Sequence, residues 1–289
     1  MSEIEIKDSR RKSYLLSIRN LPSIPIITKR VLDLLDDPMT STGNISDLIN
    51  KDQALVARVL TVANSPLYGL PRKVPSIEFA ILILGFNQIR QIVLALSMFD
   101  TFKNQDSEYW NRREFSEHSF MTAMAAKAIA DDLGYAKTSE AFTAGLLHDL
   151  GLVVTEKYFN KDFVQICDLV TNKSVSFEQA EREVMDLTHQ EIGKILCDRW
   201  HLPENLGKAI FFHHNPSENE DNVMLSAIVH LADYTTNSLD CGAFRWDVNL
   251  ELDEKIIEIL EFGSKEYVEN FIQSYKEHLE EQLESLPFN

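Results

Sequence analysis

The sequence predicts an all-α protein, a helical bundle without a sheet, and three observations support this prediction. Apolar residues recur at the three-to-four-residue spacing of helices along most of the 289-residue chain. Two capping-box patterns, Ser176 with Gln179 and Thr188 with Glu191, mark the starts of helices. No stretch alternates apolar and polar residues between two turns, which is the pattern of a half-buried strand.

Short helices joined by proline-rich turns are expected in the first part of the chain. Asp52 can cap a helix that begins with "QALVARVLTVA", because its carboxylate can accept hydrogen bonds from free amide groups of the first turn. Asn64-Ser65-Pro66 and Gly69-Leu70-Pro71 then break the pattern. The helices expected here lie at 26–35, 45–49 and 53–63.

Longer helices are expected in the second part. The segment "EYWNRREFSEHSFMTAMAAKAIADDLG" reads as one helix of about six turns or more. An apolar helix that contains "AGLL" is expected to end at Gly151, with His148 and Asp149 in its last turn. Two further helices follow the capping boxes. The others are expected at 203–214, 224–233 and, as one or two acidic amphipathic helices, 252–286.

Three regions are predicted from these shifts in pattern. Residues 14–105 form an N-terminal helical half, residues 106–240 form a second helical half, and residues 241–289 form the acidic C-terminal helices. The polar segment "TFKNQDSEYW" lies close to the first boundary and is expected to be a short linker.

Charge and composition exclude several functions. The chain has 28 basic and 45 acidic residues, a net charge of −17, which repels nucleic-acid phosphates and anionic lipid. Its longest apolar runs fall far short of the roughly 20 residues that span a bilayer. The start of the chain has no signal-peptide pattern, and its three cysteines lack CxxC spacing, so a cytoplasmic location with reduced thiols is expected.

Histidines and aspartates near the ends of several predicted helices are candidate metal ligands. Side chains from different helices can converge inside a bundle, as they do in bundle-core metal sites. A mixed His/Asp set suits Fe, Mn, Zn or Ni better than a sulfur-loving ion. The alternative is a network of hydrogen-bonded buried polar groups, and His201, His230 and His278 are assigned such structural or surface roles. The candidate set is His118, His148, Asp149, His189, His213, His214 and Asp233.

These residues also carry a resemblance to known families. The order of His118, His148-Asp149 and Asp233 resembles the H…HD…D series of the HD metal-dependent phosphohydrolase superfamily. His189 and His213-His214 resemble the longer series of its HD-GYP cyclic-di-GMP phosphodiesterase branch. The segments "LPSIPIITKRVLDLLDDP", "NSPLYG" and "AILILGFNQIR" are similar to the HDOD family, the HD-related output domain of bacterial signalling proteins, over about residues 14–236. The resemblance implies an all-helical fold with an HD-like second half.

The resemblance further implies a centre for one or two divalent transition-metal ions. His118, His148, Asp149 and Asp233 would form a first site, and Asp149 would bridge to a second ion. That ion would be held by His189, His213 and His214.

Two departures from the HD-GYP pattern argue against cyclic-di-GMP hydrolysis. Leu152 stands where the HD-GYP branch has a lysine, and "NPSENEDN" replaces its acidic residue and GYP loop.

Two functions from different classes remain. The first is a signalling module with protein partners, a metal centre and little or no catalysis; it is favoured because groups that grip phosphate are hard to find. The second is a metal-dependent phosphohydrolase acting on a small phosphorylated ligand, with Arg112 and Arg113 as the nearest basic candidates. The turn around Asn64, Ser65 and Tyr68 is either a structural interhelix turn or a surface that recognises a partner.

Overall fold

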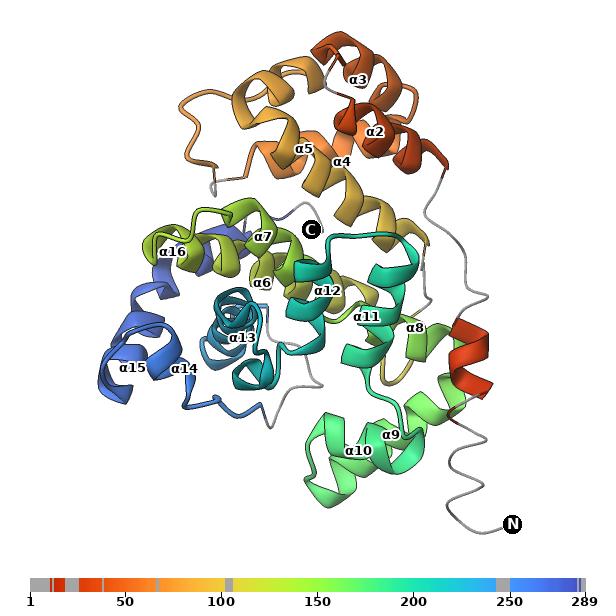
Figure 1. The fold of residues 1–289 in the computed structure, drawn as a ribbon, viewed down its shortest axis with the longest axis vertical. Helices are drawn as coiled ribbons and strands as arrows, with labels where there is room; N and C mark the ends of the chain where they lie inside the picture. Colours follow the sequence, from red (N-terminus) through yellow and green to blue (C-terminus); the bar gives the residue numbers. More distant parts are fainter. Residues whose placement is uncertain are drawn as a thin grey trace.

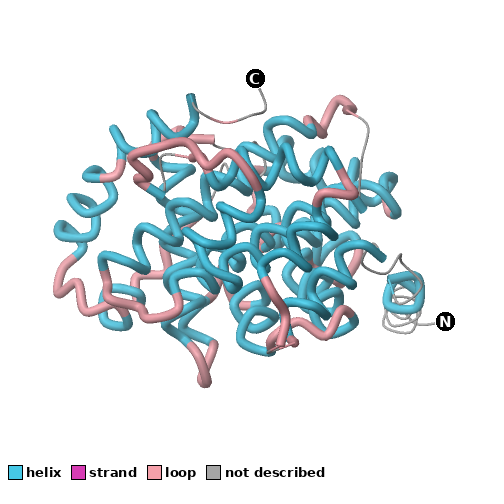
Figure 2. Tube along the Cα trace, turned by 90° about the horizontal axis from the view of Figure 1, so that it is seen from above, coloured by secondary structure: helices cyan, strands magenta, loops and turns pink. Residues whose placement is uncertain are grey.

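The chain folds into helices throughout the described part of the computed structural model, which confirms the predicted all-α class (Figures 1 and 2). The described residues are 11, 13–18, 26–37, 39–65, 68–101, 106–242, 250–284 and 286. Within them, extended pairing is limited to one isolated bridge between Ser107 and Trp110. The α-helices that Figure 1 labels are α2 (Ile26–Asp36), α3 (Thr42–Ile49), α4 (Gln53–Ala63), α5 (Ile77–Thr101), α6 (Arg112–Asp132), α7 (Thr138–Leu147), α8 (Leu150–Tyr158), α9 (Asn160–Lys173), α10 (Phe177–Val184), α11 (His189–Arg199), α12 (Glu204–Phe211), α13 (Val223–Ser238), α14 (Ile256–Ile259), α15 (Lys265–Ser274) and α16 (Lys276–Glu284).

Helices α2 to α5 form an N-terminal lobe, at the top of Figure 1. As predicted, Asp52 caps α4 by accepting a hydrogen bond from the Leu55 amide at 3.0 Å. Helix α5 is kinked at Gly85, whose φ of 81° is in the left-handed region that favours glycine. It packs against α2, α3 and α4, and it also contacts α7, so it joins the lobe to the rest of the molecule.

The turn after α4 is held by its own polar side chains. The Asn64 amide donates to the carbonyls of Leu60 at 2.7 Å and Val74 at 3.1 Å, and its oxygen accepts from the Val74 amide at 2.7 Å. The two bonds with Val74 tie the end of α4 to the segment before α5, and the bond to Leu60 holds the Asn64 side chain against its own helix. For Asn64 they support the interpretation as a structural turn.

The body of the molecule is built around α6, which packs against α7 and α13. The crossing of α6 and α7 is close because Gly145 has no Cβ; an added Cβ would lie 2.9 Å from the Ala123 Cα. Helix α12 packs against α7, α11 and α13, and α11 packs against α8. The C-terminal helices also pack on this body, α14 against α13 and α16 against α6.

Several predicted boundaries differ from the structure. The helix expected at 203–214 ends at Phe211, the one expected at 224–233 continues to Ser238, and the described part of the C-terminal segment forms three helices instead of one or two. The long helix begins at Arg112 instead of residue 108, because Asn111 caps it by accepting from the Arg113 amide at 2.9 Å. The prediction that an apolar helix ends at Gly151 is wrong: α7 ends at Leu147, and Gly151 is the second residue of α8. Gly151 is needed there for close packing, since a Cβ would lie 2.0 Å from the His189 carbonyl oxygen.

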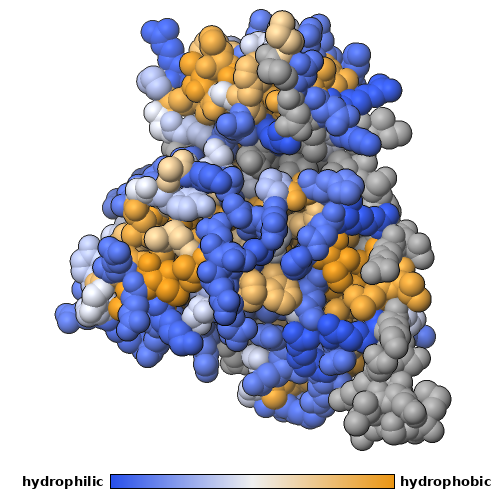
Figure 3. Space-filling view, in the orientation of Figure 1, coloured by the Kyte–Doolittle hydropathy of each residue, from blue (hydrophilic) through white to orange (hydrophobic). Residues whose placement is uncertain are grey.

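The face of the molecule seen in Figure 3 is mainly hydrophilic with separate apolar patches, one of them over the N-terminal lobe. Among the residues of α5, the large apolar side chains of Phe79, Leu82, Ile83 and Phe86 are exposed. None of the helices in the described segments is both long enough and apolar enough to span a membrane. The predicted division at 14–105, 106–240 and 241–289 stays a prediction, and residues 102–105 of the expected linker lie outside the described residues.

Candidate metal centre

The structure brings all seven candidate residues together in the body. His118 comes from the middle of α6 and Asp233 from α13, while His148 and Asp149 form the junction between α7 and α8. His189 is the first residue of α11, directly after its cap Thr188, and His213 and His214 follow α12. Six of the seven are buried, and His214 is partly exposed.

The first group consists of His118, His148 and Asp233. The Nε2 atoms of His118 and His148 lie 3.2 Å apart. The Asp233 Oδ1 lies 3.3 Å from the His118 Nε2 and 3.7 Å from the His148 Nε2. The Asp149 Oδ2 completes the group, at 3.6 Å from the His118 Nε2 and 3.3 Å from the His148 Nε2.

The second group consists of Asp149, His189, His213 and His214. The His189 Nε2 lies 3.4 Å from the His213 Nε2 and 3.1 Å from the His214 Nε2. The Asp149 Oδ1 lies 3.5 Å from the His189 Nε2 and 3.6 Å from the His213 Nε2. Asp149 therefore presents one oxygen to each group and stands between them.

The outer ring nitrogens orient the imidazoles. The Nδ1 of His118 donates to the Gly242 carbonyl at 3.1 Å, that of His148 to the Gly145 carbonyl at 2.7 Å, and that of His213 to the Ile210 carbonyl at 2.7 Å. A carbonyl only accepts, so each Nδ1 carries the proton, and in the neutral ring the Nε2 lone pair faces inward. His189 is oriented differently: its Nδ1 donates to the Glu181 carboxylate at 2.8 Å.

The two aspartates are buried without ordinary hydrogen-bond partners for three of their four carboxylate oxygens. Both oxygens of Asp149, and the Oδ2 of Asp233, have none within the described part of the chain. The Asp233 Oδ1 accepts from the Asn237 amide at 3.1 Å. Buried carboxylates of this kind are costly unless a cation compensates them.

The histidines supply part of that compensation in the protein alone. Burial by itself would raise the pKa of Asp149, but His148, His213 and His189 hold it well below its usual range. Burial lowers the pKa of His148, yet Asp149 and Asp233 raise it to about 9. Burial lowers the pKa of His213, and burial with His213 and His189 beside it lowers that of His214 still further, so these two rings are neutral at pH 7.

This arrangement fits divalent transition-metal ions. In each group the potential ligand atoms lie within 4.8 Å of one another, so a single ion could contact all of them. Neutral imidazoles and carboxylates are ligands that suit Zn, Fe, Ni and Mn. The outward Nδ1 bonds are the support that histidine ligands usually have. The described structure thus contains a His/Asp cluster that could bind metal.

Residues assigned structural roles from the sequence lie outside this cluster. The Nδ1 of His230 donates to the His213 carbonyl at 2.7 Å, and its Nε2 accepts from the Asp253 amide at 2.9 Å. His201 and His278 belong to neither group. Leu152, which stands in the place of the HD-GYP lysine, is 2% exposed and part of the apolar core.

Sequence reasoning missed two supporting side chains, Asn237 and Glu181. A signal for Glu181 was present, because Phe177, Ala180, Glu181 and Val184 share the helical spacing of one face of α10. A glutamate in an apolar stripe needs a buried partner. The partner here is His189, which no local pattern links to α10.

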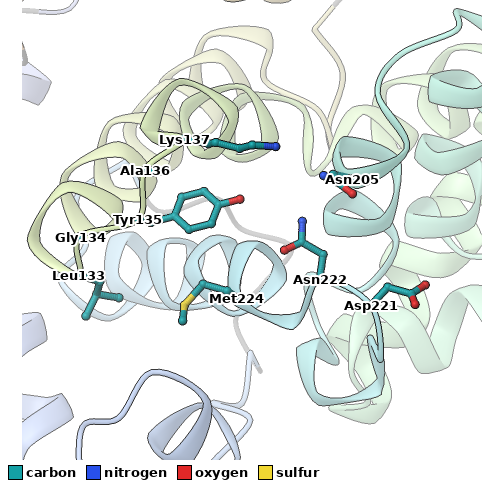
Figure 4. Close-up of a pocket in the computed structure, with 9 residues that line it drawn as sticks. All are labelled: Leu133, Gly134, Tyr135, Ala136, Lys137, Asn205, Asp221, Asn222 and Met224. Atoms are coloured by element: carbon teal, nitrogen blue, oxygen red, sulfur yellow. The ribbon is translucent and has the colours of Figure 1, made fainter.

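A separate pocket of about 520 Å³ lies at the N-terminal end of α7, away from the candidate metal centre (Figure 4). Helix α7 has ten residues, a length of about 15 Å, and His148 follows its other end. The side chains of Tyr135, Lys137, Asn205 and Asn222 point toward one another there. Lys137 also pairs with Glu140 at 3.1 Å. This pocket does not include any of the seven candidate residues.

Comparison with known proteins gives one family. A family model, HDOD domain, matches residues 21–216. A solved HDOD domain protein with unknown function from Geobacter sulfurreducens is 27% identical, with 99% of each chain covered and a TM-score of 0.78. A candidate phosphohydrolase from Shewanella amazonensis is 22% identical, with 94% of this chain and 97% of that chain covered and a TM-score of 0.73, which shows the fold alone.

One curated relative is longer than this chain. An uncharacterised protein of Treponema pallidum is 26% identical over 242 residues, which are 82% of this chain and 47% of that protein. The chain thus spans about half the length of that relative.

Proposed function

Since the chain belongs to the HDOD family, we propose that it is a bacterial intracellular signalling module whose His/Asp centre binds one or two divalent transition-metal ions and catalyses little or nothing. The observation that carries the metal is Asp149. It is buried between two groups of imidazoles with neither carboxylate oxygen in an ordinary hydrogen bond. His118, His148, Asp149 and Asp233 would hold one ion.

A second ion would be held by His189, His213 and His214, with Asp149 shared between the two. When bound, such an ion supplies Lewis acidity and lowers the pKa of a coordinated water. The outward hydrogen bonds of the histidines would position the ions, and the residues of the first group are buried away from solvent. His214 is the partly exposed member of the second group.

Weak or absent catalysis is supported by the charges near the centre. Transfer of a phosphoryl group needs groups that neutralise its charge. Within the described residues, the ion pairs of Asp149 and Asp233 are all with histidines. Arg113, a basic candidate from the sequence, pairs with Glu117 at 2.7 Å. The position of the HD-GYP lysine is filled by the buried Leu152.

The alternative function is a metal-dependent phosphohydrolase acting on a small phosphorylated compound. The carboxylate of Asp149 between the two groups and the partial exposure of His214 favour it. The fold is also that of a Shewanella amazonensis protein named as a candidate metal-dependent phosphohydrolase, 17% identical, with a TM-score of 0.66.

Metal content and turnover together test the proposal. Protein purified without added metal is analysed for transition metals, and then assayed with Mn, Fe(II), Ni and Zn separately on p-nitrophenyl phosphate and cyclic-di-GMP. We expect one or two ions per chain, no cyclic-di-GMP hydrolysis and at most slow p-nitrophenyl phosphate turnover. Robust turnover that disappears in Asp149→Ala would replace the proposal by its alternative. Protein that binds no metal at all would contradict both.

The partners are proposed to be proteins. A net charge of −17 opposes binding to nucleic acid and to anionic membranes. We expect no binding to duplex DNA by fluorescence anisotropy and no co-sedimentation with phosphatidylserine vesicles at physiological salt. Binding to either would contradict this part of the proposal.

A further inference from the structure

Glu181 is a buried carboxylate whose contacts all point to the centre. It lies on α10 and is 0% exposed. Its Oε2 accepts from the His189 Nδ1 at 2.8 Å, and its Oε1 accepts from the His189 main-chain amide at 3.0 Å. Its ion pair in the described part of the chain is with His189 alone. Both oxygens therefore hold one residue, at its ring and at its backbone.

The second group differs from the first in its charge. Asp149 and Asp233 both face His118 and His148, so the first group has two carboxylates for two imidazoles. The second group has three imidazoles and only the Asp149 oxygen that it shares. An ion there would be poorly neutralised by its own ligands. A carboxylate behind one of the imidazoles makes that ring a better ligand and adds the missing negative charge.

We propose that Glu181 is a positioning residue for the second group, which fixes His189 and makes binding of the second ion depend on its carboxylate. The inference rests on the proposed metal centre. It adds to that centre a residue whose loss should affect metal binding at the second site and not at the first. Removing the charge of Glu181 is expected to lower the affinity for the second ion by about 10–100-fold, which is the usual effect of losing a group that hydrogen-bonds to a metal ligand. The first ion should keep its affinity.

Asn237 provides the matched control on the other side of the centre. Its side-chain amide donates to the Asp233 Oδ1 at 3.1 Å, so it supports the first group as Glu181 supports the second. Asn237→Ala should lower the affinity for the first ion and leave the affinity for the second ion unchanged. Comparing the two variants separates a local effect on one site from a general loss of structure.

The experiment is a titration of metal-free, full-length protein with Co(II), followed by visible absorption and by competition with a chelator. Glu181→Gln keeps the shape and an oxygen acceptor but loses the charge, and Glu181→Leu removes both. Tm values of the metal-free proteins report folding. We expect wild-type protein to bind two ions, Glu181→Gln to bind one with wild-type affinity and the other 10–100-fold more weakly, and Glu181→Leu to weaken that second ion at least as much.

Each other outcome overturns the inference in a recognisable way. Two ions bound by Glu181→Gln with wild-type affinities would show that its charge does not matter. If both variants, Glu181→Gln and Asn237→Ala, lose affinity equally at the two sites, the cause is a general loss of structure and not the Glu181 carboxylate. If wild-type protein binds one ion and Glu181→Gln binds it with the same affinity, this inference is overturned, whereas the proposed function still holds. Wild-type protein that binds no Co(II) would overturn both.

Discussion

Gly151→Ala should damage both stability and the candidate metal centre. Gly151 is the second residue of α8, where its missing side chain lets the helix rest on the backbone of His189. An alanine Cβ would lie 2.0 Å from the His189 carbonyl oxygen and 2.7 Å from its Cα. To restore the 3.4 Å at which ordinary contacts begin, the two backbones must separate by about 1.4 Å. No side chain can rotate to relieve this overlap.

The magnitude follows from the cost of overpacking. Such insertions cost about 1–3 kcal/mol, and the upper part of the range applies because the contact is with backbone. Alanine recovers at most about 1 kcal/mol through its higher helix propensity. A net loss of about 2 kcal/mol corresponds to a Tm lower by roughly 3 °C, because the unfolding entropy of a 289-residue chain is about 0.6 kcal/mol/K. Movement of His189 away from the Asp149 Oδ1, now 3.5 Å from its Nε2, should also weaken bound metal by about tenfold or more.

Gly43→Ala is the matched control. Gly43 is also the second residue of its helix, α3, but the nearest atom to an added Cβ is the Ser41 Oγ at 3.8 Å. This variant should be as stable as wild type or up to about 1 kcal/mol more stable. Urea unfolding and thermal melts of both variants, with and without metal, measure the difference. If Gly151→Ala is as stable as wild type and binds metal equally well, the packing of α8 on His189 described above is wrong.

Three further predictions test other parts of the structure. The double variant His148→Ala, Asp149→Ala should release bound metal and abolish the stabilisation that metal gives wild type, about 2.7 kcal/mol at free metal 100 times the Kd; a chelator that leaves the wild-type Tm unchanged would refute this. Asn64→Ala should lower the free energy of unfolding in urea by about 1–3 kcal/mol, since it removes three hydrogen bonds between the Asn64 side chain and main-chain groups; a loss below about 0.5 kcal/mol would show that the turn does not depend on them. Although partial burial raises the pKa of Asp253, hydrogen bonds, the largest from Ser217, hold it below its ordinary value, so its contribution to stability is present above about pH 4 and is lost as the pH falls through the lowered pKa. Asp253→Asn should therefore weaken the acid dependence of the Tm, and an unchanged pH profile would contradict this.

Local patterns determined the helices of this protein well. The capping boxes at Ser176 and Thr188 and the cap at Asp52 form as predicted, because a cap needs only a side chain and the amides of the next turn. The types of the candidate ligands were also readable, since histidines and aspartates are uncommon in apolar segments. Where the local pattern was ambiguous, as at Gly151, the predicted boundary was wrong.

Tertiary structure alone decided how those residues meet. His118 is oriented by the carbonyl of Gly242, 124 residues away, and His189 is oriented by Glu181 on the preceding helix. Asp149 becomes a shared carboxylate because α6, α11 and α13 approach the α7–α8 junction from different directions. Gly151 allows one of these approaches, through a contact with His189 that no sequence spacing specifies. Helix periodicity and caps depend on neighbours within a few residues, whereas a buried centre depends on packing among segments far apart in the chain.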